Sequence, residues 1–222
     1  MKRVVVTSSF AAILDEDKLD DPHTVFSEKH WNPATMEDFS KSRPIVYRLS
    51  KKYAEKAAWD FVANEKPNFD VATVCPPLVL GPVVHHFASL ETINTSNERL
   101  VALLEGKWKE EIPPTGPVQF WVDVRDTARA HILAMDVPEA GGKRHFAIAG
   151  YFSNREILDT VRRNFPELED RLPPRDLKGG DPAPADQIAK YDNSDTVNTL
   201  GIKFTSLEDS VVDLVKSVKG RI

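Results

Sequence analysis

Two apolar segments separated by a helix-like segment constrain the fold of this chain more than any other feature. Residues 3–9 read RVVVTSS and residues 70–82 read DVATVCPPLVLGP, and neither segment alternates between apolar and polar side chains. Uninterrupted segments rich in β-branched residues are typical of strands buried on both faces of a parallel sheet. The helix-like segment, residues 44–62, starts at Pro44 and ends before Pro67. This order predicts a right-handed βαβ unit and therefore an α/β fold.

The rest of the chain also alternates predicted helices and strands. A strand that turns into a helix is predicted at 118–136, a strand at 143–150, and helices at 97–106, 153–165 and 204–218. Ser153 and Thr205 are predicted N-caps, since Glu156 and Glu208 follow each at the spacing of a capping box. The first helix is expected to pack through one apolar face: Ala54, Ala57, Ala58, Phe61 and Val62.

Composition narrows the class of protein and its location. The 222 residues are 41% hydrophobic and 28% charged, as in globular domains, and the net charge of −5 does not indicate a nucleic-acid-binding protein. Cys75 is the single cysteine, so a disulfide within the chain is excluded and a reducing compartment fits. We expect neither a signal peptide nor a membrane span. His85 and His86 lack further ligands at metal-binding spacing, so no metal site is predicted. The predicted location is cytoplasmic.

Four short segments in a fixed order resemble one enzyme family. They are VVVTSSFAA, YRLSK, CPPLVLGP and FWVDVRDTARAH. Together they resemble the extended short-chain dehydrogenases/reductases, and among these the fungal NADPH-dependent methylglyoxal and ketone reductases and the related dihydroflavonol reductases. The resemblance implies the C-terminal part of a doubly wound, parallel, Rossmann-like sheet with a smaller mixed α/β substrate lobe. Residues 1–82 and 118–150 would form the incomplete core, and residues 83–117 and 151–222 the substrate-binding lobe.

The resemblance implies that Ser9, Tyr47 and Lys51 are catalytic. Tyr47 and Lys51 are four residues apart and therefore share one side of the predicted helix. Tyr47 would donate a proton to the carbonyl oxygen that accepts a hydride. Ser9, at the end of the first strand, would hydrogen-bond that oxygen, with Ser8 as the alternative. Taken alone, the Tyr47–Lys51 pair would be no more than a solvated pair on a helix.

Simple electrostatics supports the role of Lys51. A free Tyr has a pKa of about 10, so activity near pH 7 requires a shift of about 3 units, or about 4 kcal/mol. An ammonium group about 5 Å away, at an effective dielectric constant of about 20, contributes about 3 kcal/mol. Lys51 could therefore supply most of the shift, and the positively charged nicotinamide of the oxidised cofactor the rest.

The resemblance also implies further binding residues. The cofactor would be NADP(H), with NAD(H) left open. It would be bound by Tyr47, Lys51, Val79 and Ser96. The substrate, a small aldehyde or ketone, would contact four side chains: Phe10, Leu14, Pro44 and Leu78. Ordinary packing and turn formation are the competing interpretations for Val79 and Ser96.

The front of the chain departs from the family. Its members bind the pyrophosphate with a G-x-x-G-x-x-G turn at a helix N-terminus. This sequence has no such turn, because the glycine pairs at 141–142 and 179–180 lack the strand–turn–helix context. By comparison with the family, Met1 coincides with the fifth strand, and roughly the first third of a member is missing. The strand at residues 3–9 would then expose an edge that invites pairing with another chain.

Several interpretations of this departure stay open. The sequence could be a fragment or have a misassigned start. It could be one half of a split enzyme, or a dimer that completes its sheet with a partner chain. It could also be a shortened paralogue that no longer reduces a substrate. The main functional prediction is an NAD(P)H-dependent reductase of aldehydes or ketones, with Tyr47 as general acid. The alternative is a non-catalytic fragment or interaction module that uses the strand edge to bind a partner.

Overall fold

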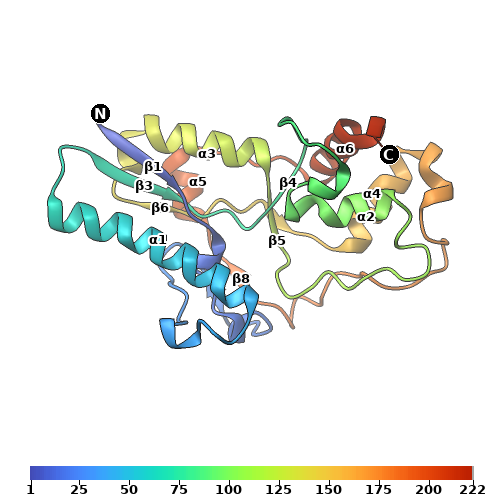
Figure 1. Cartoon of the computed structure of the whole chain (residues 1–222), viewed down its shortest axis with the longest axis horizontal. Coiled ribbons are helices and arrows are strands. Elements are labelled where there is room, and N and C mark those ends of the chain that lie inside the picture. The colour runs from blue at the N-terminus through green and yellow to red at the C-terminus, as the bar shows by residue number, and fades with distance from the viewer. Residues whose placement is uncertain (222) are drawn as a thin grey trace. The chain divides into compact units, whose positions relative to one another are not determined.

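The computed structural model describes residues 1–221, apart from the side chain of Glu91. The chain, coloured by residue number in Figure 1, forms two compact units. The first unit comprises Met1–Pro77, Asp126–Ile148 and Ala185–Lys203, and the second comprises Leu78–Arg125, Ala149–Pro184 and Phe204–Ile222. These ranges describe packing, so the predicted catalytic and substrate-binding roles of the lobes stay predictions.

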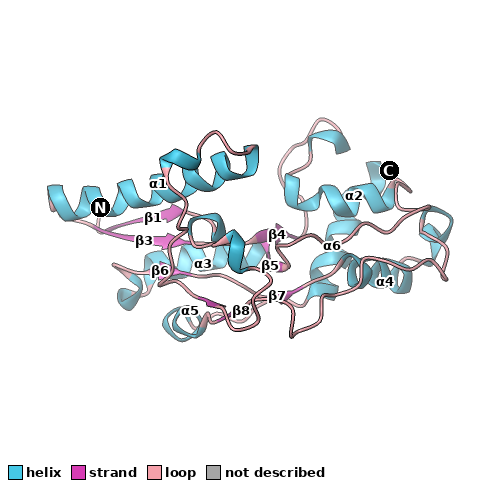
Figure 2. Ribbon diagram, turned by 90° about the horizontal axis from the view of Figure 1, so that it is seen from below, coloured by secondary structure: helices cyan, strands magenta, loops and turns pink. Residues whose placement is uncertain are grey.

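The first unit contains the predicted βαβ unit. Strand β1 (Arg3–Thr7) leads through the helix α1 (Arg43–Glu65) to β3 (Asp70–Val74), which pairs with β1 in parallel, Val5 opposite Ala72. The short strand β6 (Arg144–His145) pairs with the other edge of β3, also in parallel. Figures 1 and 2 show α1 on one side of this sheet and α3 (Val124–Asp136) on the other. This arrangement confirms the predicted α/β fold with a parallel sheet.

Strand β1 is less buried than its sequence predicts. Among the described strands it pairs only with β3, and its valines are half-buried. In contrast, Val71, Ala72 and Val74 of β3 are buried, because strands flank β3 on both sides. One edge of β1 is thus open to further pairing in the part of the chain that the structure describes.

The packing face predicted for α1 is wrong in part. Ala54, Ala57 and Phe61 are exposed, and Leu49 and Glu55 are the buried residues of the helix. The apolar pattern did not predict the buried side of α1, because a glutamate lies on that side. Its charge is balanced by an arginine that is distant in the sequence. Pro44 lies in the first turn, as predicted, and Ser42 is the N-cap.

Aromatic side chains fill the core of the first unit. The Phe10 ring lies 5.3 Å from that of Phe26, edge to face, and 5.4 Å from that of Phe146, stacked. Phe26 belongs to β2 (Val25–Phe26), which pairs with β8 (Lys190–Tyr191), and α5 (Ser194–Leu200) follows. Phe10 belongs to the loop that leaves β1, so this loop contributes a buried side chain to the core of the unit.

The second unit contains a separate sheet. Its strands β4 (Leu78–Leu80) and β5 (Phe120–Asp123) are parallel, and β7 (Gly150–Tyr151) is antiparallel to β5. The segment predicted as one strand at 70–82 is therefore two strands in different sheets. Pro76 and Pro77 separate them, because proline has no backbone N–H to donate to a sheet.

Three helices complete the second unit: α2 (Glu98–Leu104), α4 (Asn154–Asn164) and α6 (Leu207–Val218). Ser153 is the N-cap of α4, as predicted: its Oγ accepts from the Glu156 N–H and donates to the Glu156 carboxylate. The cap of α6 is Ser206 with Asp209, one residue later than predicted. The apolar faces of these helices enclose a core that includes Leu103, Leu158 and Val215.

Short 3₁₀ helices link these elements: η1 (Phe10–Ala12), η2 (Glu16–Lys18), η3 (Met36–Asp38), η4 (Leu90–Thr92), η5 (Thr95–Asn97), η6 (Pro138–Ala140), η7 (Pro166–Arg171) and η8 (Lys219–Arg221). Within residues 1–221, no helix combines the length and the apolar character needed to cross a membrane.

Candidate active site

Two adjacent serines at the end of β1 have different surroundings. Ser9 is the N-cap of η1, and its Oγ accepts a hydrogen bond from the Ala11 N–H over 3.1 Å. Ser8 is buried, and its hydroxyl donates to Glu55 Oε2 over 2.5 Å. A hydroxyl that is committed to a buried carboxylate is a poor candidate for contacting a substrate, so this geometry favours Ser9 over Ser8.

Tyr47 and Lys51 lie on one side of α1, one turn apart. The Tyr47 side chain is 56% exposed, and its hydroxyl has no hydrogen-bond partner among the described residues. The Lys51 ammonium donates to the Thr7 carbonyl over 3.0 Å. The structure thus brings Lys51 to the strand end that leads into Ser9. No hydrogen bond joins Tyr47 to Lys51 within the described residues, and the predicted electrostatic coupling of the pair stays a prediction.

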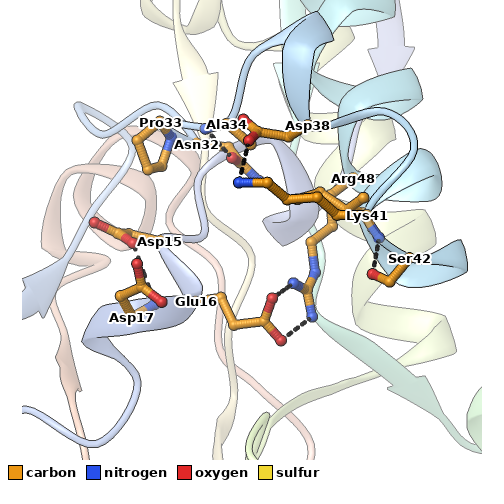
Figure 3. Close-up of a pocket in the computed structure, with 11 residues that line it drawn as sticks. Asp15, Glu16, Asp17, Asn32, Pro33, Ala34, Asp38, Lys41, Ser42 and Arg48 are labelled. Carbon is orange, nitrogen blue, oxygen red and sulfur yellow. Dashed lines mark hydrogen bonds and ion pairs between the residues drawn. The ribbon is translucent and has the colours of Figure 1, made fainter.

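A polar cavity of about 470 Å³ lies beside the start of α1 (Figure 3). Two ion pairs line it, Glu16 with Arg48 and Asp38 with Lys41. Hydrogen bonding from Arg48 holds the pKa of Glu16 below its usual range. Arg48 directly follows Tyr47, so the Glu16–Arg48 pair ties the loop after β1 to the helix that carries the predicted proton donor.

The four residues predicted to line the substrate pocket have unlike positions. Phe10 and Leu14 are buried in the first unit, close in sequence to Ser9. Pro44 is exposed in the first turn of α1. Leu78 is half-buried at the start of β4, in the second unit. Asp15 and Ile45, the neighbours of Leu14 and Pro44, line the polar cavity.

Two residues predicted to bind the cofactor contact each other in the second unit. The Val79 backbone N–H donates to Ser96 Oγ over 3.2 Å. Val79 lies in the middle of β4, where it pairs with Val122 of β5. The hydroxyl of Ser96 therefore fixes the backbone at Val79, and the role of both residues in cofactor binding stays a proposal.

Asp123 and Arg125 form an ion pair at the start of α3. Asp123 is fully buried, and its Oδ1 accepts from both the backbone N–H and Nε of Arg125, at 2.7 and 2.9 Å. Arg125 also bonds Asp213 of α6 over 2.7 Å. Burial opposes the charge on Asp123, but the hydrogen bonds from Arg125 hold its pKa below its usual range. This pair is structural.

Sequence analysis did not single out Glu55, which is 1% exposed. It follows Lys51 by four residues on α1, so it lies on the same side of the helix as Tyr47 and Lys51. A glutamate at this spacing inside an alanine-rich helix was the available signal. Its main partner, Arg144, is 89 residues away and could not be identified from the sequence.

Proteins that are similar in sequence to this chain include fungal reductases. No protein-family profile matches the chain. It is 42% identical to the ketoreductase azaE of Aspergillus niger over 98% of its own length and 62% of that protein. It is 33% identical to the NADPH-dependent methylglyoxal reductase GRE2 of Saccharomyces cerevisiae over 100% of its length and 66% of that protein. The chain is thus similar in sequence to proteins named as fungal ketone and methylglyoxal reductases.

Solved structures of similar proteins include relatives with the same fold. The crystal structure of Gre2 from Candida albicans in complex with NADPH superimposes with a TM-score of 0.85 at 32% identity, over 100% of this chain and 65% of that chain. The predicted Rossmann-like fold class is thereby confirmed. The chain spans slightly less than two thirds of the length of these relatives.

Proposed function

We propose that this chain carries the catalytic residues of an NADPH-dependent reductase that converts small aldehydes or ketones to alcohols, reversibly. One observation carries the proposal: Lys51 is hydrogen-bonded to Thr7 at the end of β1, two residues before Ser9, and Tyr47 is exposed one turn away on the same side of α1. The relatives support it, since they are named as ketone and methylglyoxal reductases.

The residues present fit one end of the cofactor. Lys51 uses one of its three N–H donors on Thr7, so two remain for ribose hydroxyls. The Tyr47 hydroxyl is equally available. The nicotinamide would supply the hydride. NADPH is favoured over NADH because a relative is named for NADPH and a related structure contains it.

The chain's own side chains would handle the proton. Ser9 Oγ accepts from Ala11, which leaves the hydroxyl proton free to donate to the substrate oxygen. Tyr47 would protonate that oxygen as negative charge develops on it, and Lys51 would stabilise the phenolate that results. In the direction of oxidation the same groups would remove the proton.

A non-catalytic interaction module is not favoured, because similar proteins are named as reductases. Three further assignments remain proposals: the second unit as the substrate-binding lobe, pairing of the β1 edge with a partner, and a cytoplasmic location.

Loss of NADPH absorbance in the presence of methylglyoxal and other small carbonyls tests the proposed activity. We expect Tyr47→Phe to abolish turnover and to leave the melting temperature unchanged, since the hydroxyl bonds no described residue. Tyr53→Phe is the matched control, because Tyr53 is another exposed tyrosine of α1. Full activity in the Tyr47 variant, or an equal loss in both variants, would reject Tyr47 as the proton donor.

A further inference from the structure

A buried carboxylate lies on α1 one turn after the proposed catalytic residue Lys51. Glu55 is 1% exposed and accepts hydrogen bonds from Ser8 Oγ at 2.5 Å, Thr73 Oγ1 at 2.8 Å and Trp59 Nε1 at 3.3 Å. Burying a charge without partners is costly, so each donor matters to the stability of this arrangement. The donors come from the end of β1, from β3 and from α1 itself. Glu55 therefore links three elements of the first unit.

Arg144 of β6 balances the charge of Glu55. Its Nε and Nη2 donate to the two carboxylate oxygens at 2.7 and 3.1 Å. Its Nη1 donates to the carbonyls of Glu28 and His30, both at 2.6 Å. The guanidinium also stacks on Trp31, with Cζ 3.8 Å from the ring centroid. Although burial opposes ionisation, the bonds from Arg144 hold the pKa of Glu55 below its usual range.

Two successive turns of α1 hold two successive residues of the chain before Ser9. Lys51 donates to the Thr7 carbonyl, and Glu55 accepts from the Ser8 hydroxyl. A single attachment would let the helix rotate or slide against the strand. Two attachments, one turn apart on the same side of α1, restrict both movements.

We propose that Glu55 is a positioning residue that sets the orientation of α1 against the end of β1, so that Tyr47 and Ser9 face the same substrate oxygen. Glu55 touches no reacting group and would act through Ser8 and the helix. This inference rests on the proposed function. It predicts that loss of the carboxylate changes the surroundings of Tyr47, which lies two turns away.

Fluorine NMR of protein labelled with fluorotyrosine measures this effect without requiring turnover. The chain has four tyrosines, so the Tyr47 signal can be assigned by its disappearance in Tyr47→Phe. In Glu55→Gln we expect this signal to shift and broaden. A kcat lower by roughly tenfold or more should accompany it, with a smaller change in KM, because misplacing a reacting group slows the chemical step. Ser8→Ala removes one attachment. It should change the Tyr47 signal and kcat in the same direction as Glu55→Gln, but by less.

Asp70→Asn is the matched control. Asp70 accepts from Arg3 at 2.6 and 2.9 Å, at the opposite end of β1 and β3. Like Glu55→Gln, this change breaks a carboxylate–arginine pair in the first unit, but the Ser8 attachment stays intact. We expect a lower melting temperature with an unchanged Tyr47 signal and kcat.

The outcomes of these measurements distinguish the positioning role of Glu55 from the proposed function. If Glu55→Gln leaves the Tyr47 signal unchanged, or if Asp70→Asn alters it equally, Glu55 is not a positioning residue. If Glu55→Gln does not fold, the Tyr47 signal in Ser8→Ala decides in the same way. If the wild-type chain shows no turnover even at saturating NADPH while the signal shifts as expected, the proposed function fails, and the role of Glu55 in orienting α1 against the end of β1 stands.

Discussion

Ser8 and Ser9 show how far the surroundings of a residue determine its role. The hydroxyl of Ser8 bonds the buried Glu55, whereas that of Ser9 bonds only a local N–H. We therefore expect Ser8→Ala to lower the free energy of unfolding by about 1–3 kcal/mol, because a buried acceptor loses its donor. Ser9→Ala should cost about 1 kcal/mol or less, as for a helix cap, yet lose more turnover.

Urea unfolding and NADPH-dependent turnover of the two serine variants test this expectation. A greater loss of stability in Ser9→Ala than in Ser8→Ala would contradict the hydrogen bonding described here. A greater loss of turnover in Ser8→Ala would instead make Ser8 the candidate for contacting the substrate.

At the scale of single residues, the sequence predicted the local site residues but not the contacts between distant residues. Tyr47, Lys51 and Ser9 belong to short segments that can be compared with a family. Arg144 could not be assigned to Glu55 in this way, because their contact depends on how β6 enters the sheet beside β3. An ion pair between residues that are distant in the sequence can be predicted only once the fold is known.

At the scale of elements, β4 ends in a close approach to β5. Gly81 has a φ of 118°, and a Cβ at this position would lie 2.8 Å from Asp123 Oδ2. We expect Gly81→Ala to lower the free energy of unfolding by about 1–3 kcal/mol for the backbone alone, and by more for the contact. Gly116→Ala is the control, since its φ is 91° and a Cβ there would have no neighbour within 4 Å. Urea unfolding that shows equal losses in the two variants would mean that β4 moves away at no cost.

The type of most elements was predictable, and their ends were less so. Periodicity placed α1, α4 and α6, but the cap of α6 is Ser206 because either of two adjacent hydroxyl residues could start that helix. The strand predicted at 143–150 is regular only at Arg144–His145. Its continuation instead joins a second sheet as β7, at Gly150–Tyr151. Such boundaries depend on which partner strand is available, and the sequence does not encode this locally.

At the scale of the whole molecule, a buried histidine couples stability to pH. His145 is fully buried, its Nε2 lies 3.1 Å from the Ala140 carbonyl, and its Nδ1 has no hydrogen-bond partner among the described residues. Burial lowers its pKa, and the hydrogen bond to Ala140 and the charge of Asp195 only partly oppose this effect. The unfolded chain therefore binds the proton first as pH falls. Stability should decrease below about pH 6.5 and be unaffected by this group above it.

Urea midpoints at about pH 7.5 and about pH 5.5 measure this coupling. His145→Gln cannot titrate, so its midpoint should depend less on pH than that of the wild type, even if it is lower at both values. His23→Gln, a change at an exposed position, is the control and should keep the wild-type dependence. Equal pH dependence in all three proteins would show that His145 does not limit stability in acid.

Cofactor affinity is also a property of the whole molecule. Lys51 and Val79 would contact the nicotinamide end, and the sequence contains no G-x-x-G-x-x-G motif for the pyrophosphate. We expect this chain alone to bind NADPH weakly. Joining it to the remaining third of the Saccharomyces cerevisiae relative should improve the affinity roughly a hundredfold, since each charge-assisted hydrogen bond to phosphate contributes about 1.5–3 kcal/mol. The open edge of β1 is where such a segment could pair.

Calorimetry with NADPH compares the chain with this chimera. The chimera that carries Tyr47→Phe is the control: it should bind NADPH as the chimera does and show no turnover, because the phosphate contacts and the proton donor are independent. Equal affinity of the chain and the chimera would mean that these 222 residues bind the pyrophosphate in some other way. Turnover by the chain alone, at low NADPH, would lead to the same conclusion, because hydride transfer requires the cofactor to stay bound beside Tyr47.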